Sequence, residues 1–182
     1  MWFTGLPAAG KSTLAARLES RLIDAGRSAY VLDGDNLRHG LCGDLGFDRS
    51  DREENIRRTG EVACLFADAG TSVLVALVSP YRSARQHVRE THERCGLPFV
   101  EVFVNTPLQA CEARDPKRLY ARARAGLLDA LTGIDSPYEP PTQPDAEVRP
   151  EMDLDTATAT VLAALDTAVR RQSANLKTGG ER

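Results

Sequence analysis

A short loop near the start of the chain constrains its fold more than any other feature: Gly5-Leu6-Pro7-Ala8-Ala9-Gly10-Lys11-Ser12, followed by Thr13. The loop fits the pattern Gly-x4-Gly-Lys-Ser/Thr and lies between a short apolar run and a helix-like segment. In such a loop, backbone N–H groups point at phosphate oxygens, and the following helix adds the positive end of its dipole. We expect Lys11 to reach the β- and γ-phosphates and the Ser12 hydroxyl to ligate Mg²⁺. The motif predicts binding of a nucleoside triphosphate but does not identify what receives the phosphate.

The composition is that of an ordinary globular chain. The 182 residues are 42% hydrophobic and 27% charged, which suits a single domain with its own core. We assign this domain to residues 1–171 and predict a flexible tail over residues 172–182. The net charge of −3 favours neither nucleic acid nor an anionic membrane as a partner. Because the four cysteines are widely separated and no apolar run has membrane length, we expect reduced thiols and a cytoplasmic protein.

Apolar segments of strand length alternate with segments of helical periodicity. Strands are predicted over residues 1–4, 29–32, 72–78 and 99–104. Helices are predicted over residues 11–25, 51–69, 83–94, 107–113 and 157–171. Asp51 is the predicted N-cap of the helix over residues 51–69. Such alternation implies parallel strands joined by right-handed crossovers. The predicted fold class is therefore α/β, the three-layer fold of P-loop NTPases, with a central parallel sheet flanked by helices. We expect the basic residues 114–126 to form a mobile helical lid and residues 132–150 to form an ordered loop.

Polar residues follow the predicted strands at the edge where ligands gather in an open parallel sheet. Asp33 and Asp35 follow the second strand, and Ser79 follows the third. One carboxylate could hold Mg²⁺ through water while the other orients or deprotonates an acceptor hydroxyl, as phosphoryl transfer requires. A pair of aspartates that cap a turn and a helix is the alternative. The upstream loop favours the functional interpretation.

A second group of candidate residues lies downstream of the two aspartates. Arg38, Arg52 and Asn55 suit a phosphate or sulfate, because a guanidinium fork binds two oxygens. A solvated basic helix face is the alternative. Phe47, in the intervening loop, could stack on a base as an exposed aromatic or anchor the loop as a buried one.

Taken together, these residues resemble the adenylylsulfate kinase family, whose members use ATP to phosphorylate the 3′-hydroxyl of adenosine 5′-phosphosulfate. The resemblance spans roughly residues 2–165, and its most specific parts are Asp33–Leu41, Arg114–Lys117 and Thr132–Glu139. It implies ATP and adenosine 5′-phosphosulfate as substrates and Mg²⁺ as the cofactor. It also implies a homodimer, with association with ATP sulfurylase as a further expectation.

The resemblance implies a role for each matching residue. Residues 5–13 would hold the ATP phosphates, with Arg114 beside the base and Lys117 acting from the lid. Ser12 and Asp33 would hold the metal, and the catalytic residues would be Lys11, Asp33, Asp35 and Ser79. Ser79 matches a serine recorded in the family as a phosphoserine intermediate, although direct in-line transfer explains the same residues equally well. The implied acceptor-binding residues are Asp35, Arg38, Phe47, Arg52, Asn55, Leu131 and Ile134.

Several features depart from the family's usual pattern. Pro7-Ala8-Ala9 stands where the family usually has Ser-Gly-Ser, and the Ala8 methyl either requires a negative φ or tolerates strain. Leu131 replaces a Phe that would form one of two aromatic walls around the acceptor adenine, which would weaken acceptor binding by about 1 kcal/mol. Arg118 replaces a Gly in the lid. The chain also begins at its first predicted strand, without the N-terminal segment that many relatives carry.

Two other functions stay open on the sequence alone. The chain could be a P-loop kinase for another small acceptor, such as a sugar or a modified nucleoside, with Ala8 and Leu131 marking the change. It could also be a non-catalytic nucleotide-binding partner in a sulfate-activating complex. The retention of Lys11, Ser12 and the two aspartates argues against the second of these.

Overall fold

Five parallel strands form the centre of the computed structural model, which describes the backbone of residues 1–179 and the side chains of residues 1–174. The strands lie in the order β2-β3-β1-β4-β5, and each pairs in parallel with its neighbours. The predicted α/β fold with a central parallel sheet is confirmed. The strands are β1 (Trp2–Thr4), β2 (Ala29–Asp33), β3 (Ser72–Ala76), β4 (Glu101–Val104) and β5 (Ala146–Val148).

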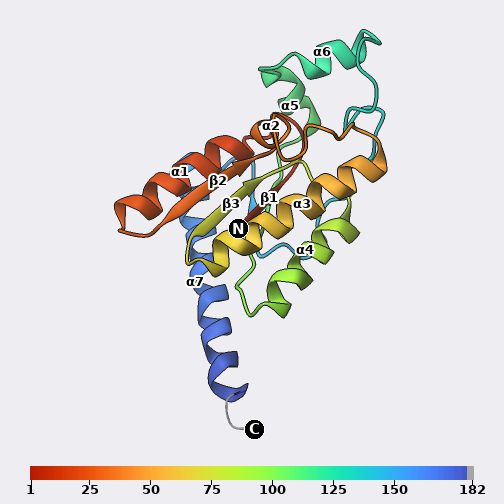
Figure 1. Cartoon of the computed structure of the whole chain (residues 1–182). Coiled ribbons are helices and arrows are strands. Elements are labelled where there is room, and N and C mark those ends of the chain that lie inside the picture. Colours follow the sequence, from red (N-terminus) through yellow and green to blue (C-terminus); the bar gives the residue numbers. More distant parts are fainter. Residues whose placement is uncertain (180–182) are drawn as a thin grey trace.

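Helices cover both faces of the sheet because successive side chains of a strand point to opposite faces. Phe3 and Leu74 belong to a core that includes residues of α1 and α7, whereas Trp2 and Val75 belong to a second core with residues of α3 and α4. Figure 1 shows the resulting three layers. The long helices are α1 (Lys11–Asp24), α3 (Arg49–Asp68), α4 (Arg82–Arg94) and α7 (Leu154–Gly179). Within residues 1–179, none of the helices is both long and apolar enough to cross a bilayer.

The short helices gather at one end of the sheet, at the top of Figure 1. They are α2 (Gly34–Leu37), α5 (Leu108–Arg114) and α6 (Leu119–Arg124). The end of α5, the turn after it and α6 correspond to the predicted basic lid at residues 114–126. The lid therefore lies at the same end of the sheet as α2, which directly follows β2.

The structure differs from the sequence prediction at β5, at the cap of α3 and at the end of α7, and it adds the short helix α2. β5 lies within residues 132–150, for which the sequence predicts a loop. The sequence does not reveal this strand, because three residues after a Pro-rich stretch are too few to show a strand pattern. The N-cap of α3 is Asp48 rather than Asp51: the Asp48 carboxylate accepts from the Asp51 amide at 2.8 Å, and the Asp51 carboxylate accepts from the Gly46 amide at 2.6 Å. Helix α7 runs to Gly179, so residues 172–179 of the predicted tail are helical, while residues 180–182 lie outside the described part of the chain.

The α3 cap leads to a stability prediction. Replacing Asp48 by Ala removes the acceptor of an otherwise unpaired helix amide, so we expect the free energy of unfolding to fall by about 1 kcal/mol. Urea unfolding followed by circular dichroism measures this change. Asp68→Ala, at the other end of the same helix, is the control, because an acidic residue is unfavourable at a helix C-terminus. An equal loss of stability in both variants would contradict the capping role of Asp48.

Candidate active site

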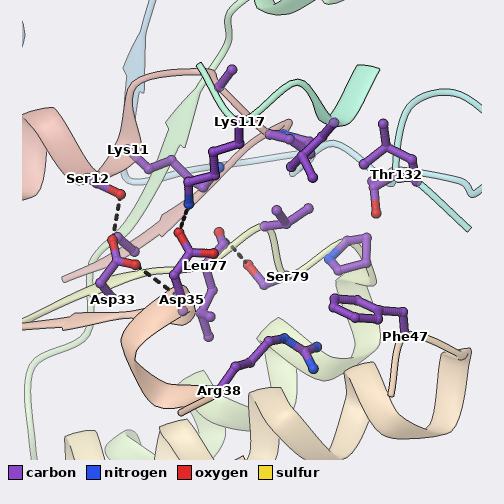
Figure 2. Close-up of a pocket in the computed structure, with 18 of the residues that line it drawn as sticks. Lys11, Ser12, Asp33, Asp35, Arg38, Phe47, Leu77, Ser79, Lys117 and Thr132 are labelled. Carbon is purple, nitrogen blue, oxygen red and sulfur yellow. Dashed lines mark hydrogen bonds and ion pairs between the residues drawn. The ribbon is translucent and has the colours of Figure 1, made fainter. Parts of the chain in front are cut away.

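A cavity of about 580 Å³ opens beside the phosphate loop and the ends of β2 and β3, and part of its lining is drawn in Figure 2. Most of the residues singled out from the sequence line it: Pro7, Ala8, Gly10, Lys11, Ser12, Thr13, Asp33, Asp35, Arg38, Phe47, Arg52, Asn55, Ser79, Arg114, Lys117 and Leu131. The four others, Gly5, Leu6, Ala9 and Ile134, are not among its lining residues. Ile134 instead packs against the core between the sheet and α1. The structure thus brings the two predicted groups of site residues into one cavity.

The phosphate loop passes very close to the neighbouring strand β4. Gly5 has a φ of +151°, and a Cβ there would lie 2.6 Å from the Val104 carbonyl oxygen, so a larger residue does not fit. The loop then turns into α1, whose N-cap, Gly10, provides no side-chain cap. Because the first amides of a helix have no acceptor within the helix, the N-terminus of α1 offers its N–H groups to an anion in the cavity.

The carbonyl oxygens of the phosphate loop are bound by side chains from other elements. Thr106 Oγ1 donates to the Ala9 oxygen at 2.9 Å, and Tyr120 donates to the Pro7 oxygen at 2.9 Å. Arg114, at the end of α5, also donates to the Ala9 oxygen, at 3.4 Å. These contacts hold the negative ends of the loop's peptide dipoles away from the position that an anion would take.

Lys11 is the buried cation of the cavity. Its side chain folds back over the loop, and its ammonium donates to the Gly5 oxygen at 2.9 Å and to the Leu6 oxygen at 2.8 Å. Burial lowers the pKa of Lys11 from 10.5 to about 8. Asp33 opposes this shift in pKa and the charge of Lys117 adds to it. A phosphate in the cavity would favour the charged form of this lysine.

Ser12 and Asp33 form a pair of hard oxygen donors. The Ser12 hydroxyl donates to Asp33 Oδ2 at 2.5 Å (Figure 2). Hydroxyl and carboxylate oxygens in this arrangement fit Mg²⁺, which usually takes one or two protein ligands and completes its shell with phosphates and water. Among the described residues, no group of three or more His, Cys, Asp or Glu side chains could hold a metal ion. A metal at this pair would complete its shell with substrate oxygens and water.

The two aspartates are both structural and accessible to a ligand. Asp33 is the N-cap of α2, since its Oδ1 accepts from the Asp35 amide at 2.9 Å. The Asp35 carboxylate forms an ion pair with the Lys117 ammonium from the lid (Figure 2). The two interpretations of this pair of aspartates are thus compatible, because the cap uses only one oxygen of Asp33.

Phe47 and two arginines form the outer wall of the cavity. Phe47 is 55% exposed, so it is the exposed aromatic of the two predicted alternatives. The Arg38 guanidinium lies 4.2 Å from the centroid of its ring, and that of Arg52 lies 5.7 Å away. Arg52 also donates to Thr132 Oγ1 at 3.0 Å and to the Ala130 oxygen at 2.5 Å, which joins the start of α3 to the segment after the lid.

Asn55 is a buried donor without an acceptor. It is 4% exposed and lines the cavity, and its Nδ2 has no hydrogen-bond partner among the described residues. Leaving such a group unpaired is unfavourable by about 1–3 kcal/mol. A ligand oxygen in the cavity would remove this penalty, so the side chain marks a position for an acceptor atom.

Ser79 is held in place on several sides. Its φ is +40° and its side chain is 3% exposed. The hydroxyl accepts from Trp2 Nε1 at 3.1 Å and donates to the Leu77 oxygen at 3.5 Å. The residue therefore lies in the cavity wall with its hydroxyl already engaged.

The cavity includes residues that the sequence analysis did not single out. Among them are the last residue of β3, the two residues after it and the segment that precedes Leu131, namely Ala76, Leu77, Val78, Leu128, Asp129 and Ala130. Their position directly before Ser79 and Leu131 in the chain is the signal that could have found them.

Comparison with known proteins identifies this arrangement. The family model for adenylylsulphate kinase matches residues 1–149. The chain belongs to the adenylylsulphate kinase family. It is 60% identical over 146 residues to an adenylyl-sulfate kinase of Enterobacter sp. (strain 638), which covers 79% of this chain and 71% of that protein.

Two further relatives of this adenylylsulphate kinase family member come from Mycobacterium tuberculosis. A bifunctional enzyme CysN/CysC is 51% identical over 168 residues, which is 92% of this chain but only 27% of that longer protein. The structure of the APS kinase CysC in complex with AMPPNP and APS matches with a TM-score of 0.89 at 52% identity, covering 91% of this chain and 95% of that one. The predicted family, P-loop kinase fold and kinase class are confirmed.

Two of the departures from the adenylylsulphate kinase pattern fall on left-handed backbone. Ala8 has a φ of +59° and Arg118 a φ of +56°, and at both positions the resemblance leads us to expect Gly. This conformation is unfavourable by about 1–2 kcal/mol for a residue with a Cβ. The Ala8 methyl therefore tolerates strain rather than imposing a negative φ.

The lowered pKa of Lys11 leads to a prediction about nucleotide binding. With a pKa of about 8, about half of the free protein should lack the Lys11 charge at pH 8. Bound phosphates should restore this charge, so binding should take up about half a proton. Nucleotide affinity should accordingly fall as the pH rises above 8. Calorimetry with ADP at pH 8, in two buffers of different ionisation enthalpy, measures the uptake. Lys11→Arg is the control, since a guanidinium stays charged at this pH, and equal uptake in both proteins would contradict the assignment to Lys11.

Proposed function

We propose that this kinase transfers the γ-phosphoryl group of ATP to the 3′-hydroxyl of adenosine 5′-phosphosulfate. The observation that carries the proposal is the single cavity in which the phosphate loop faces Arg38, Phe47 and Asn55. The M. tuberculosis relative, solved with AMPPNP and APS, supports it, because a donor nucleotide and the sulfated acceptor are both bound there.

The donor half of the cavity suits a triphosphate. The N-terminus of α1 and the Lys11 ammonium would bind the phosphates of ATP, with residues 5–13 forming the loop around them. Arg114, which lies against the back of the loop, would flank the base. Lys117 would close over the phosphates from the lid, for which it must leave Asp35. Phosphoryl transfer depends mainly on such positioning and on charge neutralisation.

Mg²⁺ is the metal that we propose for this site. Ser12 and Asp33 would hold it, because their oxygens are close together and of the hard type that it prefers. When bound, the metal would neutralise charge on the phosphates of ATP.

The acceptor half of the cavity suits a sulfated nucleotide. Asp35, which lines this cavity, would orient the 3′-hydroxyl and accept its proton. Arg38, Arg52 and the unpaired Asn55 amide would bind the phosphosulfate end and the ribose, while Phe47 would stack on the adenine. Leu131 would form the opposite, aliphatic wall. Ile134, which packs in the core, would act by supporting that wall.

We further propose direct transfer between the two substrates, without a phosphoserine. The Ser79 hydroxyl is buried and hydrogen-bonded to Trp2 and to the Leu77 oxygen. Among the described residues, neither hydrogen-bond partner of this hydroxyl is a basic side chain. A general base that activates the nucleophile is the usual requirement for a covalent intermediate.

The assembly and location of the protein are also proposals. We infer a homodimer in the cytoplasm from the family resemblance. Association with ATP sulfurylase agrees with the name of the bifunctional relative, in which a segment similar to this chain is part of a longer protein.

A coupled assay of ADP release across acceptors tests the proposed reaction. We expect turnover with adenosine 5′-phosphosulfate and none with sugars, and a fall of at least about 100-fold in Lys11→Ala, because the variant lacks the phosphate-binding charge. Arg149→Ala, on the exposed surface, is the control for a lost cation. Activity on a sugar alone would favour the other kinase function, and ATP binding without turnover would favour a non-catalytic partner.

The role of Ser79 is tested separately. Under direct transfer, Ser79→Ala should keep at least about a tenth of the kcat, because it loses only hydrogen bonds that position the turn. Steady-state kinetics and intact-mass measurement after incubation with ATP check this. Complete loss of kcat with unchanged nucleotide binding, together with a phosphorylated wild-type protein, would overturn direct transfer.

A further inference from the structure

Arg85 is a fully buried arginine that contacts the wall of the cavity from behind. Its side chain is 2% exposed, and each of its three guanidinium nitrogens donates to a different segment of the chain. Nε donates to Glu101 Oε1 on β4 at 2.6 Å, Nη1 to the Ser79 oxygen at 2.7 Å and Nη2 to the Glu139 oxygen at 2.8 Å. One planar group thereby joins the turn after β3 to the segment 132–139.

The turn that Arg85 holds has a conformation that it would not adopt alone. The positive φ of Ser79 is unfavourable for a residue with a Cβ, and such strain persists only where neighbours determine the backbone. Thr4 Oγ1 donates to the Val78 oxygen at 2.8 Å and lies 3.0 Å from the Tyr138 hydroxyl. The Glu139 amide donates to the Pro80 oxygen at 2.8 Å. Arg85 is the charged centre of this network.

This turn lies on the side of the cavity that carries the acceptor residues. The Ser79 hydroxyl bonds to Trp2, which packs in the core beneath α3 and α4. Helix α3 also carries Arg52 and Asn55, whereas the phosphate loop leads into α1 on the opposite face. A shift of the turn would therefore alter the acceptor half of the cavity and leave the donor half in place.

We propose that Arg85 is a positioning residue for the acceptor: it fixes the Ser79-Pro80 wall against the segment 132–139, and so sets the width of the acceptor half of the cavity. The inference rests on the proposed function. A single hydrogen-bonding ammonium cannot span the three acceptors that the guanidinium fork reaches. Replacement of Arg85 by Lys therefore keeps the charge and loses the geometry.

The test compares Arg85→Lys with the matched variant Arg89→Lys. Arg89 lies one turn further along α4 and pairs with Asp145 at 2.6 Å and with Glu101 at 3.9 Å, but no hydrogen bond joins it to Ser79 or Glu139 among the described residues. We expect Arg85→Lys to raise the KM for adenosine 5′-phosphosulfate about tenfold, with the KM for ATP changed less than about twofold. Arg89→Lys should leave both KM values within about twofold of the parent protein.

Trp2, the single tryptophan of the chain, gives a second readout in the folded protein. Because its indole N–H bonds to Ser79, its emission should shift clearly in Arg85→Lys. Arg89 reaches Trp2 indirectly, through the ring of Phe99, so Arg89→Lys should shift the emission less. If Arg85→Lys fails to fold, Tyr138→Phe tests the same turn from the other side, and its acceptor KM should rise about threefold with the ATP KM unchanged.

The outcomes separate the two proposals. A parent protein that does not turn over adenosine 5′-phosphosulfate contradicts the proposed function. An active parent whose Arg85→Lys variant matches Arg89→Lys, or raises both KM values equally, overturns the positioning role. The same holds if a folded Tyr138→Phe, used in its place, leaves the acceptor KM unchanged.

Discussion

Two glycines fix the phosphate loop between its neighbours, and the rest of the site depends on this placement. On one side, Gly5 lets the backbone pass against the Val104 carbonyl of β4. On the other, Gly133 has a φ of +96° and a Cβ there would lie 2.9 Å from Leu6 Cδ2, so the segment after the lid packs closely onto the loop at this glycine. The loop is thus held from both sides, beside the cavity. The acceptor wall is built on that same segment, which Gly133 joins to the loop at one end and Arg85 holds through the Glu139 oxygen at the other.

The layers of the fold follow from patterns that the sequence displays directly. Apolar strands such as 72–76 and the four-residue spacing of leucines in α1 predict their own structure, because period and burial are coupled. The cap of α3 could not be assigned in the same way. Asp48 and Asp51 are both carboxylates at the start of the helix, and only the backbone decides which of them meets a free amide.

The site was predictable in its residue types and not in its contacts. The phosphate-loop motif and the paired aspartates identify Lys11 and Asp33 as site residues from the sequence alone. The buried, unpaired amide of Asn55 is a property of the folded chain, since neither its depth nor its lack of an acceptor is encoded locally. Arg85 is the converse case: charged residues are expected outside, and its burial depends on acceptors that lie 6, 16 and 54 residues away along the chain.

The ion pair between Asp35 and Lys117 has a consequence for how ligands enter. Both side chains are more than half exposed, at 63% and 56%, so the pair stabilises the position that the lid holds in this structure by at most about 1 kcal/mol. An incoming ligand that separates them therefore loses at most about fivefold in apparent affinity. Separating the pair therefore adds little to the free-energy cost of ligand binding. Occupancy of the cavity then depends on the affinity of the ligands. Lys117 of the lid would pair with the Asp35 carboxylate in the free protein and with ligand phosphates in the complex.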